Sequence, residues 1–374
     1  MANTLKLGAG KWATGTDTVL AFNDENNNFK PLPFSFSRAS SATVVNQSGL
    51  IETVGSGEPR IDFQGNTKGA LLLEPQRTNL IPYSNDFSSV NNAEFATPNY
   101  GTSPEGLSVS RVLFTSANQS MSANTSLSTG VVCNFSAYVK GVQGEFIKFA
   151  AGGQDISHFF SGQWERLSGS ATSINNSWNL NTYGYATARD FLICGAQLEV
   201  GSYSTSIIPT SGSAVTRVGD ACTNGANSEV INSTEGVLYA EISALANDGT
   251  YRGLCLSNGS ASNRVLIYLN NGSNQLRANV VAQGNLQANL IYTVSDVTIL
   301  NKVAIRWSLN NVSFWINGSK VLQDLDAPLM PTGLNELSFD SNGVGGEKFY
   351  GNTKDVRVYN TALTDAELAS LTTI

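Results

Sequence analysis

The residues from Lys302 to Gln323 constrain the fold more than any other stretch of this sequence. Apolar residues recur there at every second position: Val303, Ile305, Trp307, Leu309, Val312, Phe314, Ile316 and Val321. This is the period of β-strands that bury one face in a core. Asn310-Asn311 and Asn317-Gly318 separate the runs, and both residue types accept the positive φ of two-residue turns. The stretch therefore predicts three antiparallel strands joined by tight turns.

Composition extends this prediction to the whole chain of 374 residues. Apolar residues make up 41% and charged residues only 14%, while Asn, Ser, Thr and Gly are abundant. Such a mixture favours an all-β protein over a helical one. The net charge is −7, and no Lys/Arg-rich run is present, so nucleic acid is not expected as a partner.

Compartment and cysteine usage give only coarse indications. The first fifteen residues lack the apolar core of a signal peptide, and no run of about 18 apolar residues occurs, so we expect no membrane insertion. The cysteines have long, unmatched spacings, which favours reduced side chains within strands or loops over disulfides or metal sites. They are Cys133, Cys194, Cys222 and Cys255.

Turn signals and strand patterns divide the chain into three blocks, at 1–80, 81–225 and 226–374. The first contains short apolar patches and the compact run 69–80, read as a buried strand that Pro75 ends. The second contains strand patterns at 134–140, 163–168 and 191–199. Many short strands with Gly/Ser turns are typical of a jelly roll.

The third block adds strand patterns to the opening stretch and ends in a short helix. The additional patterns lie at 236–242, 264–269, 333–339 and 353–359. Thr364 and Glu367 have the spacing of a capping box, which predicts a helix from Thr364 to near Leu371. The fold class expected is all-β: an N-terminal segment, two antiparallel β-sandwich (jelly-roll) domains and a short C-terminal helix.

The first block carries a resemblance to a known class of protein. FSRASSATVVNQSGLIETVGSGEPRIDF, followed by GALLLEPQRTNLIPYSNDF, resembles a segment of bacteriophage virion proteins that precedes sugar-binding-type jelly rolls. The motif residues present are Arg38, Ser40, Ala42, Thr43, Pro59, Arg60, Leu72, Glu74, Arg77, Thr78 and Asn79. The resemblance implies a virion protein whose residues 1–80 form an attachment segment, and a multimer, most often a trimer.

The other two blocks resemble carbohydrate-associated folds. FSAYVKG, QWERLS and ICGAQLEVGSYSTSIIPTSGSAVTR are similar to core strands of carbohydrate-binding-module-like jelly rolls in the same phage proteins. The strand order through FWING, GLNELSFD and FYGNTKDVRVYNTALTDAELASL resembles the concanavalin A-like or laminin-G-like sandwich. Both resemblances imply contact with glycans.

Catalytic signatures are absent from the sequence. The single histidine, His158, is flanked by aromatic residues, and no Gly-x-Ser-x-Gly elbow occurs. Glucanases of the concanavalin-like class carry Glu-x-Asp-x-x-Glu on one strand, and this chain has no such string. A glycosidase needs two facing carboxylates, and the spacing offers no candidate pair. We expect a protein that is not an enzyme.

The loop from residue 340 to 347 is a candidate calcium site. Asp340, Asn342 and Glu347 offer oxygen ligands on a Gly-rich segment, which suits Ca²⁺. The alternative is a turn between strands that binds no ion. No other cofactor is expected.

Aromatic residues beside amides and hydroxyls are the candidate sugar-binding groups, because a pyranose has an apolar face and a polar rim. Trp178, Tyr183 and Tyr185 lie together in a segment rich in Asn, Ser and Thr. Packing on a neighbouring strand is the alternative for these residues. Trp315 is a further candidate for glycan binding. It alternates with Phe314, so one of the two is expected to face outward or into a subunit interface.

These patterns lead to one hypothesis and two alternatives. The hypothesis is a non-enzymatic virion protein, a tail fibre or spike or a capsid decoration or head fibre. It would bind weakly to host surface polysaccharide, contact other virion proteins and form a homotrimer that gains avidity from several weak sites. The first alternative is a purely structural cement or adaptor protein. The second is a glycan depolymerase with carboxylates dispersed along the chain.

Overall fold

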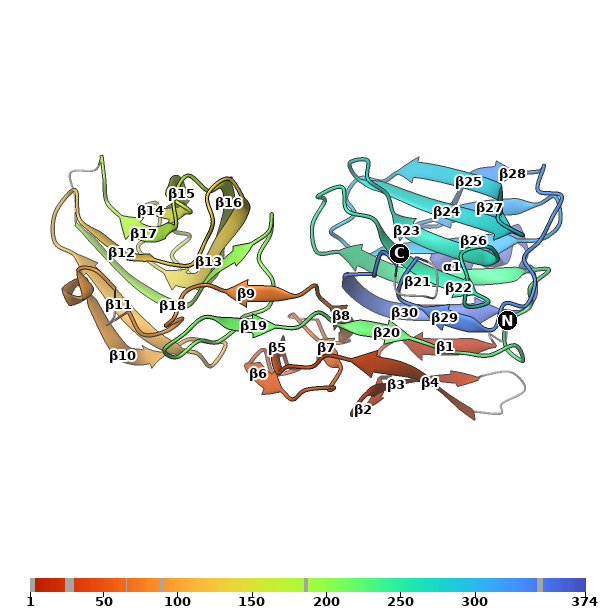
Figure 1. Cartoon of the computed structure of the whole chain (residues 1–374), viewed down its shortest axis with the longest axis horizontal. Helices are drawn as coiled ribbons and strands as arrows, with labels where there is room; N and C mark the ends of the chain where they lie inside the picture. The colour runs from red at the N-terminus through yellow and green to blue at the C-terminus, as the bar shows by residue number, and fades with distance from the viewer. Residues whose placement is uncertain (1–3, 24–29, 65, 88–89, 185–187, 342–345) are drawn as a thin grey trace. The chain divides into compact units, whose positions relative to one another are not determined.

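The computed structural model describes residues 4–23, 30–64, 66–87, 90–184, 188–341 and 346–374. These residues form antiparallel sheets, one 3₁₀ turn and one short α-helix near the C-terminus (Figure 1). The prediction of an all-β fold with a short C-terminal helix is confirmed.

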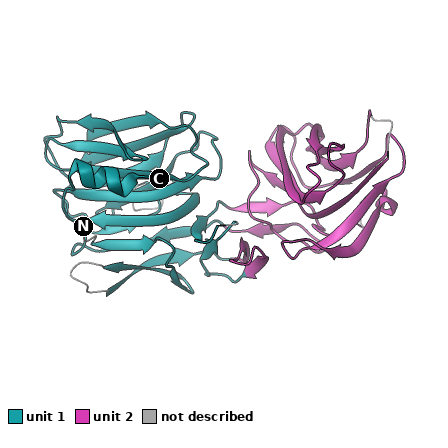
Figure 2. Cartoon of the chain, turned by 180° about the vertical axis from the view of Figure 1, so that it is seen from behind, with its two compact units in different colours: residues 1–39, 54–75, 219–374 teal, residues 40–53, 76–218 magenta. Residues whose placement is uncertain are grey.

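The chain divides into two compact units (Figure 2). Unit 1 contains residues 1–39, 54–75 and 219–374, and unit 2 contains residues 40–53 and 76–218. The boundaries expected near 80 and 225 do not coincide with this division. The physical reason is strand pairing, since the first 80 residues contribute strands to both units.

Unit 1 is a sandwich of two sheets. Within the described residues the larger sheet has twelve strands, in the order β20-β4-β3-β1-β30-β21-β26-β27-β28, with β2 beside β3, β8 beside β30 and β7 beside β8. Their bounds are β1 (Leu5–Gly8), β2 (Ala13–Gly15), β3 (Thr18–Asn23), β4 (Lys30–Ser37), β7 (Arg60–Asp62), β8 (Ala70–Leu73), β20 (Ala221–Thr223), β21 (Gly236–Ala244), β26 (Asn301–Trp307), β27 (Val312–Ile316), β28 (Ser319–Asp324) and β30 (Gly351–Tyr359).

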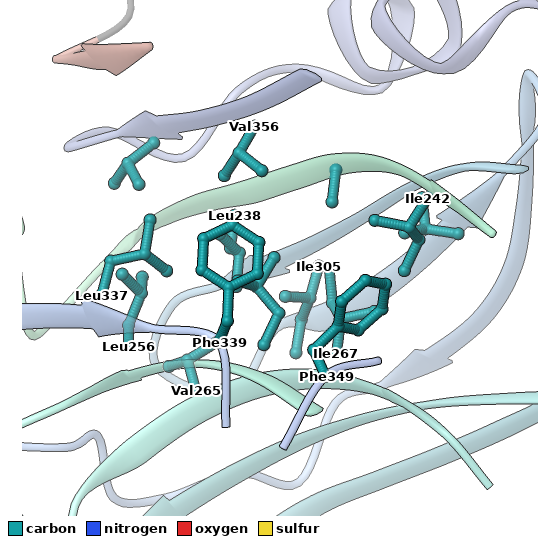
Figure 3. Packing of buried hydrophobic residues seen from close by; sticks show 14 of the residues in the cluster. Leu238, Ile242, Leu256, Val265, Ile267, Ile305, Leu337, Phe339, Phe349 and Val356 are labelled. Atoms are coloured by element: carbon teal, nitrogen blue, oxygen red, sulfur yellow. The ribbon is translucent and has the colours of Figure 1, made fainter. Parts of the chain in front are cut away.

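The smaller sheet of unit 1 has the order β25-β24-β23-β22-β29. Its strands are β22 (Arg252–Ser257), β23 (Arg264–Leu269), β24 (Gln275–Ala282), β25 (Asn285–Thr293) and β29 (Glu336–Ser338). The two sheets bury one continuous apolar core between them (Figure 3). Leu238 and Ile305 enter it from the larger sheet and Val265 and Ile267 from the smaller, all fully buried. Each such side chain stabilises the fold by about 1.5–3 kcal/mol.

The stretch from Lys302 to Gln323 forms β26, β27 and β28, paired in sequence as predicted. Trp307 lies in the core, also as predicted. Asn317 and Gly318 both adopt positive φ, 49° and 87°, as a two-residue turn between right-twisted strands requires.

The N-terminal segment completes this sheet instead of standing apart. In β1 the side chains of Leu5 and Leu7 are buried in the core of unit 1, and the strand pairs antiparallel with β30. Gly8 adopts φ +83°, and a Cβ there would lie 2.5 Å from the carbonyl oxygen of Lys354, so only glycine allows this close approach.

Unit 2 is built from two further sheets and two strand pairs. The first sheet has the order β10-β11-β18-β13-β16 and the second β12-β17-β14-β15. The bounds are β5 (Ala42–Val45), β6 (Ile51–Val54), β9 (Arg77–Asn79), β10 (Ala96–Thr102), β11 (Ser108–Phe114), β12 (Ser120–Asn124), β13 (Val132–Lys140), β14 (Phe146–Ala151), β15 (Gln154–Phe159), β16 (Glu165–Thr172), β17 (Ser177–Asn181), β18 (Arg189–Val200) and β19 (Val215–Arg217), with the 3₁₀ turn Ala93–Phe95. The predicted strands near 134, 163 and 191 are the neighbours β13, β16 and β18.

The C-terminal helix α1 (Asp365–Thr372) begins as its sequence predicts. The Thr364 side chain accepts a hydrogen bond from the Glu367 N–H, and the Thr364 N–H donates to the Glu367 carboxylate at 2.8 Å. This reciprocal capping satisfies two donors of the first turn. Leu368 is fully buried against the larger sheet of unit 1.

All four cysteines are free and buried, in β13, β18, β20 and β22. Burial raises the pKa of each thiol, for Cys194 to about 12. Of the two settings predicted, strands or loops, the structure has all four in strands. Among the described residues, no helix has both the length and the apolar character needed to cross a membrane.

Candidate functional site

Helix α1 covers only part of the outer face of the larger sheet in unit 1. Because strand side chains alternate, residues next to the core positions of β21, β26, β27 and β30 point away from the sandwich core. Helix α1 covers one part of this face (Figure 2) through a small apolar cluster. The cluster contains Val237, Tyr239, Ala304, Trp315, Tyr359, Leu363 and Leu368.

Beside the helix the same face opens into a recess of about 550 Å³. We call it the charged recess. Its lining residues are Ala9, Lys68, Tyr239, Glu241, Lys302, Lys354, Asp355, Arg357, Tyr359, Ser370 and Leu371. Strands β21, β26 and β30, the end of α1, and two N-terminal residues outside the strands, Ala9 and Lys68, therefore contribute to one cavity.

Strand register brings the charged side chains together. Glu241 of β21 lies opposite Asp355 of β30 on one side and Lys302 of β26 on the other. Two residues before Glu241 in β21, on the same face of the sheet, Tyr239 lies opposite Arg357. Side chains directly opposite each other on one face of an antiparallel pair are close enough to interact.

A β-bulge adds a further cation. Glu241 pairs with Asp355, but the next residue of β21 pairs with Thr353, so Lys354 is the extra residue of β30. A bulge redirects a side chain that regular pleating would point elsewhere. Lys354 lines the charged recess, and its ammonium lies 3.4 Å from the Glu241 carboxylate.

Asp355 is the most buried charged group of the recess, with 3% of its surface exposed. Its Oδ2 accepts hydrogen bonds from Arg357 Nε at 2.9 Å and Nη2 at 2.6 Å. Its Oδ1 is buried and has no hydrogen-bond partner. Burial raises the pKa of Asp355, although the Arg357 charge opposes this effect.

Tyr239 supplies a hydroxyl that stays protonated. Burial, followed by the nearby charges of Asp355 and Glu241, raises the pKa of its phenol. The Arg357 guanidinium lies over its ring, 5.6 Å from the ring centroid. Lys302 donates from Nζ to the carbonyl of Thr373 at 2.7 Å and so ties the sheet to the end of α1. The recess thus combines fixed donors with one unmet acceptor.

No local pattern in the sequence marks these residues as a site. The alternation in 353–359 places Asp355 and Arg357 on the face opposite Val356 and Val358. The pairing partners Glu241 and Lys302 lie more than fifty residues away, and no local pattern connects them.

Trp178 does not have the exposed face that was predicted, and this prediction is wrong. Its side chain is fully buried, stacked on Phe135 and edge-on to Phe87, with ring centroids 5.8 and 5.9 Å away. In β17 the alternation turns Trp178 and Leu180 into the core and leaves Asn179 on the other face. The alternative, packing on neighbouring strands, is the correct interpretation.

Trp315 does lie on the face opposite Phe314, as predicted, but α1 covers it. Only 5% of its surface is exposed, and its Nε1 donates to Ser313 Oγ at 3.0 Å. A sugar cannot stack on a ring that a helix already covers, so the prediction of a glycan-binding role for Trp315 is wrong.

Tyr183 is exposed by 43%, and its hydroxyl lies 2.8 Å from Ser120 Oγ. Tyr185 lies outside the described residues. Near Tyr183, Asn181 of β17 donates to Asn179 Oδ1 at 2.6 Å and to Asp155 Oδ1 at 3.1 Å. A role of Tyr183 and Tyr185 in glycan binding stays a prediction.

The predicted calcium ligands are only partly described. Asp340 is fully buried, and Glu347 accepts a hydrogen bond from Ser341 Oγ at 2.5 Å, while Asn342 lies outside the described residues. In the described part of the chain, no three acidic, His or Cys side chains form a group that could hold a metal ion. Calcium binding in this loop stays a prediction.

The residues that carry the virion resemblance have a structural explanation in unit 1. Asp220 binds two buried guanidinium groups, Arg38 Nη1 through Oδ1 at 3.1 Å and Arg60 Nη2 through Oδ2 at 2.5 Å. Arg60 also binds Glu74 at 2.6 Å, and the Glu74 N–H donates to Asp220 Oδ2 at 2.7 Å. We call these four residues the closed network.

The closed network fastens segments that are distant in sequence. Arg38, Glu74 and Asp220 each lie next to a point where the chain passes between the two units. Arg38 also donates to the carbonyls of Gly55 and Glu58, beside a further such point. The motif residues Arg38, Arg60 and Glu74 therefore have a structural role in unit 1.

Comparison with known proteins supports the fold of the third block. Residues 240–369 match the family model of the concanavalin A-like lectin/glucanases superfamily. The matched stretch lies within the block, 226–374, for which a concanavalin A-like sandwich is predicted. It contains most of the charged recess, while Ala9, Lys68, Tyr239 and the last residues of α1 lie outside it. No curated protein matches the chain.

Similarities to solved structures are weak. The CBM40 domain of the Ruminococcus gnavus IT-sialidase, bound to α2,3-sialyllactose, is 18% identical over 41% of this chain and 94% of that chain, with a TM-score of 0.34. A heptameric SAP-like pentraxin from Limulus polyphemus is 12% identical over 40% and 72%, with a TM-score of 0.30. Domains LG4-5 of the mouse laminin α1 chain are 10% identical over 69% and 92%, with a TM-score of 0.26. TM-scores this low support no inference about ligand or activity.

Proposed function

We propose that this protein is a non-enzymatic phage virion protein that binds weakly to host surface glycans through the charged recess. The observation that carries the proposal is the recess itself. It is a cavity of about 550 Å³ on a concanavalin A-like sandwich, and it is lined by converging donors and acceptors. Its volume lies in the range of small-ligand sites, although such sites are usually lined mostly by apolar side chains and this one is lined mostly by polar and charged ones.

The resemblance of residues 38–87 to virion proteins supports the virion placement. The protein would decorate the particle as a tail fibre or spike, or as a capsid decoration or head fibre, and contact other virion proteins. A homotrimer would present several weak sites at once and so gain avidity. Imaging virions with an antibody against residues 226–374 tests the placement, and virions that carry no label would contradict it.

A second candidate function is glycan hydrolysis, since the recess contains two carboxyl groups. Asp355 lies opposite Glu241, and glycosidases use two carboxyl groups that flank the scissile bond. Binding is the better proposal because a glycosidase uses both carboxyl groups on its substrate. Here Arg357 binds Oδ2 of Asp355, and Lys354 lies beside Glu241, so Oδ1 of Asp355 is the one oxygen of the two groups that is buried without a partner among the described residues. One unpaired carboxylate oxygen can accept a hydrogen bond from a ligand but does not supply the two carboxyl groups of a hydrolase.

A binding experiment separates these functions. The full chain is applied to an array of host envelope glycans, together with the variants Lys354→Gln and Lys140→Gln. Lys140 is an exposed lysine of unit 2, so its variant removes the same charge outside the recess. We expect Lys354→Gln to weaken binding at least tenfold and Lys140→Gln to leave it unchanged.

Three other outcomes would change the conclusion. Binding to no glycan by the wild type would overturn the proposal and favour the cement or adaptor alternative. Equal loss in both variants would mean that the recess is not the site. Release of reducing ends from host polysaccharide, abolished by Asp355→Asn, would establish the hydrolase.

A further inference from the structure

The charge of the recess is opposite in sign to that of the chain. Four cationic side chains line it against only two anionic ones, Glu241 and Asp355, whereas the whole chain carries −7. The cations are Lys68, Lys302, Lys354 and Arg357. A concave site of one sign attracts a ligand of the other sign.

The recess offers no aromatic platform. Its two aromatic residues, Tyr239 and Tyr359, are each only 2% exposed, so neither ring presents a face to a ligand. Neutral sugars gain much of their affinity in proteins by packing the apolar face of the pyranose on an exposed ring. A ligand of this recess must therefore be held by charge and hydrogen bonds.

Two groups are placed to make such contacts. Lys68 is exposed at the rim, and its ammonium forms no ion pair with a described residue. Its stem runs over Gly10, where a Cβ would come within 3.0 Å of it. Deeper in the recess, Asp355 Oδ1 is buried without a hydrogen-bond partner. A buried acceptor left unmet costs about 1–3 kcal/mol, which a ligand hydroxyl would recover.

We propose that the charged recess selects a pyranose that carries a carboxylate. The ligand carboxylate binds among Lys68, Lys354 and Lys302, and a ring hydroxyl donates to Asp355 Oδ1. This inference rests on the proposed function, because it names the class of glycan that the same recess takes. Uronic acids and sialic acids share this chemistry.

The test measures affinity for matched ligands by calorimetry with the full chain. One pair is a uronic-acid oligosaccharide and its carboxyl-reduced form, and the other is sialyllactose and lactose. We expect at least one acidic ligand to bind tenfold or more tightly than its neutral partner, and this preference to fall as salt rises. Whichever acidic ligand binds identifies the source of the carboxylate.

Variants assign the preference to the recess. Lys68→Gln should reduce the acidic-to-neutral affinity ratio severalfold, while Lys140→Gln, outside the recess, should leave the ratio unchanged. Equal affinity for both members of each pair would overturn the inference and leave the proposed glycan binding intact. Binding of none of the four ligands, with a positive glycan array, would also overturn it, and a negative array would remove the proposed function as well.

Discussion

Unit 1 contains two groups of charged side chains, the closed network and the charged recess. They differ in whether the oxygens of their aspartate are all hydrogen-bonded. In the closed network, both oxygens of Asp220 are bonded and every member is at most 3% exposed on its side chain. In the charged recess, Asp355 is as deeply buried, but one of its oxygens has no partner and the cavity is open to solvent. The closed network therefore stabilises the fold, whereas in the charged recess Asp355 Oδ1 can still accept a hydrogen bond from a ligand. Since Arg60 Nε also lacks a hydrogen-bond partner among the described residues, the two groups differ in the satisfaction of their aspartate oxygens, and not in burial or charge alone.

The largest effect is expected from opening the closed network. Asp220→Asn leaves the guanidinium groups of Arg38 and Arg60 buried without their shared carboxylate. Removing one partner of a buried ion pair costs about 3–5 kcal/mol, so the free energy of unfolding, measured by guanidinium denaturation, should fall by that amount. The matched control is Asp190→Asn, which breaks the exposed pair with Arg111 and should cost at most about 1 kcal/mol. Equal losses in the two variants would contradict the distinction.

Two variants of Trp178 test whether this residue stabilises the core of unit 2 or binds a glycan. Trp178→Ala should destabilise unit 2 by about 3–5 kcal/mol, because it leaves a cavity between Phe87 and Phe135. Trp178→Phe keeps an aromatic ring and removes an indole N–H that has no partner, so it should cost much less. Glycan binding by the Phe variant should equal that of wild type. Loss of glycan binding by a folded Trp178→Phe protein would show that Trp178 takes part in glycan binding.

Asp355 should change how the free energy of unfolding depends on pH. Because the pKa of Asp355 is raised in the folded protein, folding favours its protonated form. Stability from this group is fully present below the unfolded pKa of about 3.9 and is lost as the pH rises through the folded pKa. Asp355→Asn removes this loss, so its free energy of unfolding relative to wild type should increase with pH over that window. The increase is about 1.4 kcal/mol for each unit that separates the two pKa values. A constant difference across the window would show that Asp355 titrates normally.

The smallest effect is expected at the wall of the recess. Thr364→Ala removes the capping box of α1 and should cost about 1 kcal/mol. Since Ser370 and Leu371 of this helix line the recess, glycan affinity should fall slightly as well. Thr373→Ala, just beyond the helix, loses only a bond to the Ala369 carbonyl and serves as the control for both measurements. An unchanged melting temperature for Thr364→Ala would mean that packing of Leu368 alone holds the helix.

The sequence determined the local structure of this protein. Alternation and Asn-Gly turns predicted β26 to β28, and the Thr364–Glu367 spacing predicted α1, because strand period, turn geometry and capping depend on residues close together in the chain. The division into units and the recess were decided only by tertiary structure. Strand register set Glu241 against Asp355 across more than a hundred residues, a bulge turned Lys354 into the same cavity, and α1 covered Trp315. Burial of Trp178 was equally a tertiary outcome, since a polar neighbourhood in sequence does not show which face of a strand meets the core.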